Sequence, residues 1–393
     1  MKILFITARF PYPPFKGDQA IPYYRLKHMG NKDEITLLTF YENKKELTYI
    51  EKIAPYCKEV ITVKKSFFKS LFNMLVFGLF SKRPFQVLYY RSRAFEKQLK
   101  EIMDKKENAF DILHVYMLRM AEYGKDIPLP KTLELIDSMQ MNFQRRMGKE
   151  KWPRKFFFKM ELHRLKHYEN EMVEKYDRSI VVSGKDRDFI GHPEVVSIEP
   201  GIDTHEFHPE NKLSTEKVIA FTGNMGYFPN KNAILWFLTN CWESIREQVP
   251  DARLVIAGKN PGSGIAKYHD GDSVRVTGYV DSIAGVLKRA RLAVAPMQAG
   301  SGMQFKILEA MACGLPVVTT GLGLGSIPAK NNESVFVADD PGTFSQYCVR
   351  LLTDDSLAET MGKNAAQTVR QTFNWEKNVS ALYSLYEELV TVK

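Results

Sequence analysis

Cysteine is scarce in this sequence, with four residues among 393, and no two of them form a C-x-x-C pair. Such wide spacing argues against a structural zinc site and against a framework of disulfide bonds. We therefore expect a protein of a reducing compartment, most simply the cytoplasm. The N-terminus also lacks a long apolar stretch before a small-residue cleavage site, so MKILFITARF is expected to form a first β-strand rather than a signal peptide.

Uninterrupted hydrophobic runs are short as well. Segment 66–80, SFFKSLFNMLVFGLF, is interrupted by Lys69 and Asn73 and is too short to span a hydrocarbon layer of ~30 Å. Lysines beside it make it resemble an interfacial anchor, and segment 151–159, KWPRKFFFK, has the same chemistry. A buried core helix flanked by solvated lysines is the alternative.

Acidic residues are few where basic residues gather. The net charge is +9, yet residues 51–110 contain 13 Lys/Arg against 6 Asp/Glu, and residues 141–170 contain 9 against 3. This favours a negatively charged partner, although a plain solvated basic face is the alternative. The aromatic residues in these segments form runs with aliphatic ones rather than spaced stacking platforms, which predicts an anionic membrane surface and no nucleic acid.

The length and the alternation of apolar patterns predict two domains of α/β class. A chain of 393 residues is too long for one ordinary core. Short apolar runs alternate with helical patterns from about residue 217, which is typical of a parallel, doubly wound sheet, and the N-terminal half repeats the plan. We expect an N-terminal domain at 1–197, a C-terminal domain at 198–373, and a final helix at 374–393 that packs back on the first domain. The predicted strands are 2–6, 35–39, 59–63, 112–115, 132–136, 179–182, 218–222, 253–257, 274–277, 292–295 and 316–319, and the predicted helices of the second half are 232–248, 282–289 and 303–313.

The strongest local signal is segment 300–318, GSGMQFKILEAMACGLPVV. Gly300 and Gly302 lie between a predicted strand and a predicted helix, where free backbone N–H groups and the helix dipole favour a phosphate. Lys306 could bring an ammonium to a pyrophosphate, and Glu309 could accept two ribose hydroxyls. The alternative is a glycine-rich turn with a charged solvent face, since short glycine motifs have many false positives.

This segment resembles the donor-site signature of the family 4 retaining glycosyltransferases of GT-B fold, which ends in E-A-M-A-x-G-x-P-V. GIDTHEF at 201–207 and FTGNMGYFPNKNAILWF at 221–237 are similar to two further motifs of that family. The resemblance covers nearly the whole chain. It implies two Rossmann-like domains facing across a cleft, a nucleotide-diphosphate sugar held by the second, and the acceptor on the first. It also implies retention of anomeric configuration and no obligatory metal or other cofactor, with which the absence of a convincing D-x-D motif agrees. The basic, aromatic segments at 51–110 and 141–170 further predict a glycan or lipid-linked acceptor of surface polysaccharide synthesis.

The resemblance also implies the donor contacts, with departures. They fall on Gly17, Gly223, Asn224, Lys231, Tyr279, Val280, Gly300, Ser301, Gly302, Met303 and Gln304. Ser301 stands where the family commonly has a glutamate, and Asn224 where it has an arginine; the usual lysine falls among Asn230 and Lys231. We therefore predict that Lys306 supplies the phosphate-binding charge, with Lys231 as a weaker contributor.

Two polar residues at predicted strand ends are candidates for acceptor chemistry. His114 and Asp137 are expected to face the ligand, and Asp137 is the preferred acceptor-orienting or proton-accepting group because Tyr116 occupies the position of a common family histidine. A satisfied structural role is the alternative for both. His163 and His167 lie one helical turn apart without a third ligand, so no metal site is expected.

Two other functions are compatible with the same motifs. A nucleotide-sugar epimerase of related architecture would use water instead of a sugar acceptor, but the basic, aromatic N-terminal half argues against it. A glycan-binding homologue that has lost catalysis is suggested by Ser301, Asn224 and Tyr116.

Overall fold

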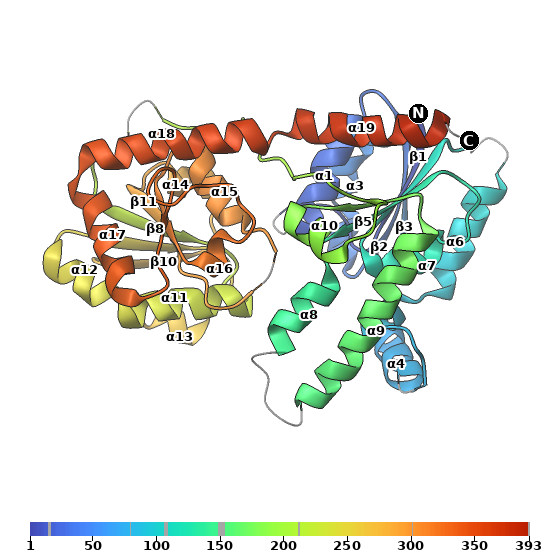
Figure 1. The fold of residues 1–393 in the computed structure, drawn as a ribbon, viewed down its shortest axis with the longest axis horizontal. Coiled ribbons are helices and arrows are strands. Elements are labelled where there is room, and N and C mark those ends of the chain that lie inside the picture. Colours follow the sequence, from blue (N-terminus) through green and yellow to red (C-terminus); the bar gives the residue numbers. More distant parts are fainter. Residues whose placement is uncertain are drawn as a thin grey trace. The chain divides into compact units, whose positions relative to one another are not determined.

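The computed structural model describes residues 1–14, 17–78, 80–105, 109–147, 154–210, 213–300 and 302–391. The chain forms two compact units, one made of Met1–Pro200 with Trp375–Lys393 and the other of Gly201–Asn374 (Figure 1). The first unit thus contains both ends of the chain. Its main segment ends inside the Pro- and Gly-containing stretch at 195–209, where two prolines and a glycine disfavour a continuous helix or strand.

The N-terminal unit is built on a seven-stranded parallel sheet of order β3-β2-β1-β4-β5-β6-β7. Its strands are β1 (Lys2–Thr7), β2 (Glu34–Tyr41), β3 (Glu59–Lys64), β4 (Ile112–Tyr116), β5 (Lys131–Ile136), β6 (Arg178–Val181) and β7 (Val195–Ser197). Its helices are α1 (Gly17–Met29), α2 (Lys44–Leu47), α3 (Ile50–Ile53), η1 (Ala54–Tyr56), α4 (Phe67–Gly78), α5 (Phe85–Tyr90), α6 (Arg93–Asp104), η2 (Leu118–Met120), α7 (Ala121–Gly124), α8 (Met139–Met147), α9 (Arg154–Lys175), α10 (Gly184–Ile190) and α19 (Trp375–Thr391). The central strands β1 and β4 are buried on both faces, which explains their continuous apolar sequence.

The C-terminal unit is built on a six-stranded parallel sheet of order β10-β9-β8-β11-β12-β13. Its strands are β8 (Val218–Thr222), β9 (Arg253–Ala257), β10 (Val274–Gly278), β11 (Leu292–Ala295), β12 (Val317–Thr319) and β13 (Phe336–Val337). Its helices are α11 (Phe228–Asn240), α12 (Trp242–Gln248), α13 (Gly262–Ala266), α14 (Ile283–Leu287), α15 (Phe305–Ala312), α16 (Gly321–Leu324), α17 (Pro341–Thr353) and α18 (Asp355–Thr372). The order changes direction between β8 and β11, so the loops that follow these strands diverge at a switch point.

The C-terminal helix α19 belongs to the N-terminal unit and packs on α1. The Trp375 ring stacks on Tyr24 with centroids 5.1 Å apart. The side chain of Asn378 donates to the Glu199 carbonyl at 2.6 Å and accepts from Arg25 Nε at 3.2 Å. The last helix is therefore fixed by both apolar and polar contacts.

The predicted α/β class with two Rossmann-like domains is confirmed. Three details were wrong. The helix predicted at 232–248 is two helices, interrupted at Cys241, whose φ and ψ of −121° and −37° depart from helical values. The helix predicted from 303 begins at Phe305, and the short strands β7 and β13 were not predicted.

Candidate functional site

The loops after β8, β9 and β10 lie against one another at the carboxyl edge of the C-terminal sheet. Gly223 N–H donates to the Ala257 carbonyl at 3.0 Å, and Gly258 N–H donates to the Gly278 carbonyl at 2.8 Å. Gly258 has φ of +142°, and a Cβ there would lie 1.8 Å from the Gly223 oxygen. Only glycine permits this approach, which brings the three loops into one surface.

Lys306, in the first turn of α15, reaches this surface. Its ammonium lies 5.1 Å from the centroid of the Phe221 ring on β8 and 3.8 Å from Met297 Sδ. The side chain is half-buried, and burial lowers its pKa to about 8, with Glu309 opposing the shift. A positive charge held in this setting is poorly solvated and would gain from an anion.

Asn230 is the hydrogen-bond partner of Lys306. Its Oδ1 accepts from the ammonium, and its Nδ2 donates to the Asn224 carbonyl at 3.0 Å. Asn224 in turn accepts the Gly226 N–H on its own side chain at 3.0 Å, which fixes the turn after β8. Asn230 was not among the predicted contacts, although the sequence comparison had placed the usual lysine of the family at this position or the next.

The glycine loop before α15 has the backbone geometry that its sequence predicts. Gly300 and Gly302 have φ of +115° and +80°. Gly300 also lies against α11, since a Cβ there would be 3.3 Å from Pro229 Cβ. Gln304 precedes the helix without a side-chain cap, and Met303 is half-buried. Ser301 lies outside the described residues.

Glu309 is half-buried one turn after Lys306, on the same side of α15. Burial raises its pKa to about 7, Glu206 adds to the increase, and Lys306 opposes it. Glu309 and Lys306 are thus electrostatically coupled, and both pKa values are displaced toward the neutral form.

Three other predicted donor residues form no side-chain hydrogen bond with Lys306 or Asn230 among the described residues. Tyr279 is 55% exposed, with the Lys259 ammonium 4.8 Å from its ring centroid. Val280 beside it is half-buried. Lys231 is exposed and lies next to Gly264, whose Cβ would be 4.0 Å from Lys231 Cε. No contact joins Lys231 to Lys306 in the part of the chain that the structure describes.

His114 does not have the position expected from its sequence. It lies in the middle of β4 and is 0% exposed, stacked on Phe5 with ring centroids 4.4 Å apart. Its Nδ1 is 2.7 Å from the Tyr386 hydroxyl and its Nε2 is 3.2 Å from Glu134 Oε2. Burial lowers its pKa, so the imidazole is neutral at pH 7. The expectation of a ligand-facing histidine was wrong, because the side chain is fully enclosed and its Nδ1 contacts interior hydroxyl groups.

Asp137 and Gly17 lie at the carboxyl edge of the N-terminal sheet. Asp137 is half-buried and follows Ile136, whose φ of +70° ends β5. Gly17 begins α1, and its carbonyl accepts from the Tyr116 hydroxyl at 3.4 Å. Both residues lie at the edge where parallel sheets commonly bind ligands, and their roles in acceptor and donor binding remain predictions.

The histidine pair on α9 has an ordinary explanation. His163 and His167 are exposed, and their rings meet edge to face with centroids 4.5 Å apart. Within the residues that the structure describes, no group of three or more His, Cys, Asp or Glu could hold a metal ion. Both side chains lie on the exposed side of α9.

Comparison with known proteins adds to this geometry. Residues 216–354, which lie within the C-terminal unit, match the sequence model of the family described as glycosyl transferases group 1. An uncharacterized 44.6 kDa protein in the cps region of Klebsiella pneumoniae is 22% identical, with 97% of this chain and 99% of that protein aligned. The UDP-Gal:alpha-D-GlcNAc-diphosphoundecaprenol alpha-1,3-galactosyltransferase of Escherichia coli is 27% identical over 51% of this chain and 56% of its own length. These matches support a group 1 glycosyltransferase.

The solved structures agree with a glycosyltransferase fold. The structure of Anabaena Alr3699/HepE in complex with UDP superimposes with a TM-score of 0.69 and 14% identity, covering 99% of this chain and 100% of the other. This likeness confirms the fold, a GT-B architecture with two Rossmann-like domains.

Proposed function

We propose that this glycosyltransferase moves a sugar from a nucleoside-diphosphate sugar to a lipid-linked glycan of a surface polysaccharide pathway, with retention of anomeric configuration. One observation carries the donor assignment. The half-buried Lys306 ammonium stands at the carboxyl end of β8 with a neutral amide, Asn230, as its hydrogen-bond partner. Glu309 is the acidic neighbour of Lys306, but its own pKa is displaced toward the neutral form, so a diphosphate would supply a fuller counter-charge.

Each part of the loop surface has a role in this proposal. The start of α15 and the glycines at 300 and 302 would offer backbone N–H groups to the diphosphate. Lys306 would neutralise the charge that develops on the leaving diphosphate, which makes a divalent metal unnecessary. Glu309 would accept hydroxyls of the nucleotide ribose.

The relatives support the substrate classes. The galactosyltransferase of Escherichia coli is named for a UDP-sugar donor and a diphosphoundecaprenol-linked acceptor, and the Klebsiella relative is named for its cps region. Retention of configuration is supported by the resemblance of segment 309–318 to the family 4 signature.

The N-terminal unit supports membrane association through α4 and the start of α9. Six large apolar side chains of α4 are 43–80% exposed, and on α9 Phe156 and Phe157 are 72% and 46% exposed. Those of α4 are Phe67, Phe68, Phe72, Leu75, Val76 and Phe77. The two helices project from the N-terminal unit (Figure 1). Phe85 of α5 packs against both of them. Its ring stacks on Phe157 of α9 with centroids 5.1 Å apart, and it occupies the space that Gly78 of α4 leaves open. A buried core helix, the alternative interpretation of segment 66–80, is excluded.

Basic residues accompany this apolar surface, although not all of those expected. Lys64, Lys69 and Lys82 are exposed. Lys65 is buried, and Arg83 contacts Glu122 and Glu171, so neither is a surface cation for lipid. The residues Lys151–Pro153 lie outside the described part of the chain. No helix among the described residues is long and apolar enough to cross a membrane. We therefore propose peripheral association with the cytoplasmic face of a membrane. That face carries anionic lipid, and the reducing cytoplasm is compatible with the four free thiols.

Calorimetric titration with UDP tests the donor site. Wild-type protein should bind UDP, and Lys306→Met should weaken binding at least tenfold, because a charged hydrogen bond contributes about 1.5–3 kcal/mol. Lys363→Met, at an exposed position on α18, is the matched control. Unchanged affinity in Lys306→Met would exclude the site. Transfer to a sugar acceptor then distinguishes a transferase from an epimerase, which needs none, and from a binding protein, which turns over no donor.

Liposome sedimentation tests the membrane surface. Wild-type protein should bind vesicles containing phosphatidylglycerol, less at high salt, and Phe68→Gln with Phe72→Gln should reduce binding severalfold. Phe189→Gln on α10 removes a less exposed aromatic residue of the same unit and should have no effect. Equal binding to neutral vesicles would contradict the electrostatic part of the proposal.

A further inference from the structure

Three cations that the proposed donor site does not use meet at the carboxyl edge of the N-terminal sheet. Arg9 follows β1, Lys65 follows β3, and Arg119 lies in η2 after β4. Strands β3, β2, β1 and β4 are consecutive neighbours in the sheet. Residues far apart in sequence thus gather where parallel sheets commonly bind ligands.

All three cations surround the ring of Tyr90, which is 3% exposed. The Arg9 side chain donates to the Tyr90 hydroxyl, and Arg119 Nη1 lies 3.4 Å from the same oxygen. The Lys65 ammonium is 4.4 Å from the ring centroid. Burial alone would raise the pKa of Tyr90, but the charges of Arg119, Arg9 and Lys65 outweigh burial and lower it. The local potential is therefore positive.

The cations are incompletely neutralised. Arg9 pairs with Asp18 at 3.1 Å, and Lys65 pairs with Glu42 at 2.6 Å. Arg119 is half-buried and has no salt bridge to any residue that the structure describes; its other hydrogen-bond contact is with Met117 Sδ at 3.0 Å. The Nε atoms of Arg9 and Arg119 are buried without a hydrogen-bond partner in the described structure. A buried donor without a partner is costly, so both guanidinium groups are strained electrostatically in the free protein.

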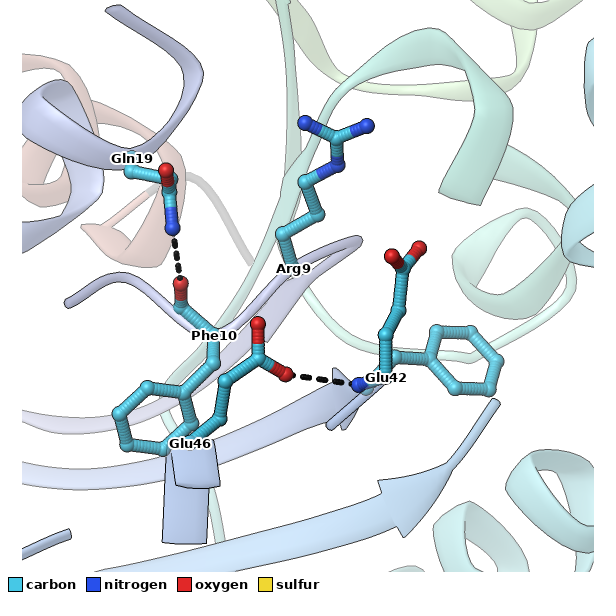
Figure 2. A pocket seen from close by; sticks show the side chains of 6 residues that line it. Arg9, Phe10, Gln19, Glu42 and Glu46 are labelled. Atoms are coloured by element: carbon cyan, nitrogen blue, oxygen red, sulfur yellow. Dashed lines mark hydrogen bonds between the residues drawn. The ribbon is translucent and has the colours of Figure 1, made fainter. Parts of the chain in front are cut away.

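A cavity of about 160 Å³ adjoins Arg9. Figure 2 shows the side chains of Arg9 and Glu42 extending in the same direction beside it. Glu46, in the wall, accepts the Glu42 N–H at 2.7 Å, and Gln19 donates to the Phe10 carbonyl at 3.0 Å. Arg9 is the one cation among the described residues that line this cavity, and its Nη1 also pairs with Asp18.

We propose that Arg9 and Arg119, with Lys65 behind Tyr90, bind a phosphate group of the acceptor. Planar guanidinium groups match phosphate oxygens in a bidentate manner, and two of them from different strand ends would fix both position and orientation. The inference rests on the proposed function, since it assigns the acidic part of the lipid-linked acceptor to the N-terminal unit. A neutral sugar would leave the charge of Arg119 unmatched.

Geranyl diphosphate is the probe, titrated into protein saturated with UDP so that the donor site is occupied. We expect Arg119→Gln and Arg9→Gln each to weaken its binding about ten- to a hundredfold. Arg187→Gln on α10, an exposed arginine paired with Asp188, is the matched control and should bind as wild type does. Inorganic pyrophosphate distinguishes the two possible sources of the phosphate group. If the site binds a lipid headgroup, pyrophosphate should bind more weakly than geranyl diphosphate; if it binds free phosphate, the two affinities should be similar.

Two results would overturn the assignment. One is equal affinity of wild type and both arginine variants for geranyl diphosphate; the other is equally tight binding of the neutral analogue geranyl glucoside. UDP titration of the same variants separates the acceptor-phosphate proposal from the proposed donor site. If the variants still bind UDP and their binding of geranyl diphosphate is unchanged, only the acceptor-phosphate proposal is refuted. Ionisation of Tyr90 provides an independent readout. In a pH titration, the difference in tyrosinate absorbance at 295 nm between wild type and Tyr90→Phe reports the pKa of Tyr90. Geranyl diphosphate should raise this pKa, because its negative charge offsets the nearby cations.

Discussion

The affinity for UDP should depend on the protonation of Lys306. Burial lowers the pKa of this side chain in the free protein to about 8, and Glu309 is the charged neighbour that opposes the shift. A bound diphosphate would favour the ammonium and raise the pKa again. Binding is therefore coupled to proton uptake wherever the free lysine is partly neutral, and affinity should fall as the pH rises through 8.

The size of the effect follows from the titration. With a free pKa of about 8, the protonated fraction falls from roughly 0.9 at pH 7 to roughly 0.1 at pH 9, so the Kd for UDP should rise about tenfold. The terminal phosphate of UDP, with a second pKa of about 6, is already ionised over this range. Glu309, whose pKa is raised to about 7, is still partly protonated at its lower end. The titrations of Glu309 and Lys306 therefore overlap, and Glu309→Gln leaves only the titration of Lys306.

Calorimetry at pH 7, 8 and 9 in two buffers of different ionisation enthalpy measures both the affinity and the proton uptake. Lys306→Arg should bind UDP without this pH dependence, because the guanidinium stays charged. Lys306→Met should bind weakly at every pH. A wild-type Kd that is constant from pH 7 to 9, with no proton uptake, would refute the reasoning even if UDP binds.

Three further predictions use other parts of the structure. Lys306→Met should raise the Tm at pH 7 by a few degrees, because the folded pKa lies below the unfolded one and the charged form therefore costs stability below about pH 8; a lowered Tm in differential scanning fluorimetry would contradict this. Arg25→Met should lower the free energy of unfolding of the N-terminal unit by about 3–5 kcal/mol, since it leaves Glu134 as an unpaired charge at 0% exposure. Arg25→Met with Glu134→Leu should recover part of the loss in urea unfolding. Chelator should leave the Kd for UDP within about twofold, since charged donors replace the metal; a large loss that magnesium restores would disprove metal independence.

The strands could be predicted because their burial leaves a simple pattern. Segments 218–222 and 253–257 are short apolar runs in the sequence and are strands β8 and β9 in the structure. Strand β13 has two residues, too few for any periodicity. The break at Cys241 was missed because apolar spacing continues through it.

His114 shows what a local pattern cannot supply. A polar residue near the end of an apolar run can either face a ligand or find partners inside. The choice here depends on Glu134, on the next strand, and on Tyr386, which is 272 residues away in α19. Neither contact has a sequence signature near His114.

The loops of the proposed donor site were located from the sequence, but the contacts between their side chains were not. The glycines and Lys306 were identified because phosphate binding needs backbone freedom and a cation. The sequence pattern favours Lys231 over Asn230, because a lysine can neutralise phosphate charge and an asparagine cannot. Helix α11 begins at Phe228 with Pro229 in its first turn, and this start directs Asn230 toward β8 while Lys231 lies exposed beside Gly264.

A comparison of the buried charges distinguishes structural from ligand-binding groups. Arg25 and Glu134 are fully buried, and each carries the charge that the other requires. Lys306 has a neutral amide as its hydrogen-bond partner, and Arg119 has a tyrosine hydroxyl and a thioether. Burial of the Lys306 ammonium is offset only in part, by Glu309, and therefore costs stability in the free protein. Because an anion would supply a full counter-charge, we propose that Lys306 and Arg119, rather than the ion pair, contact two phosphate-bearing substrates.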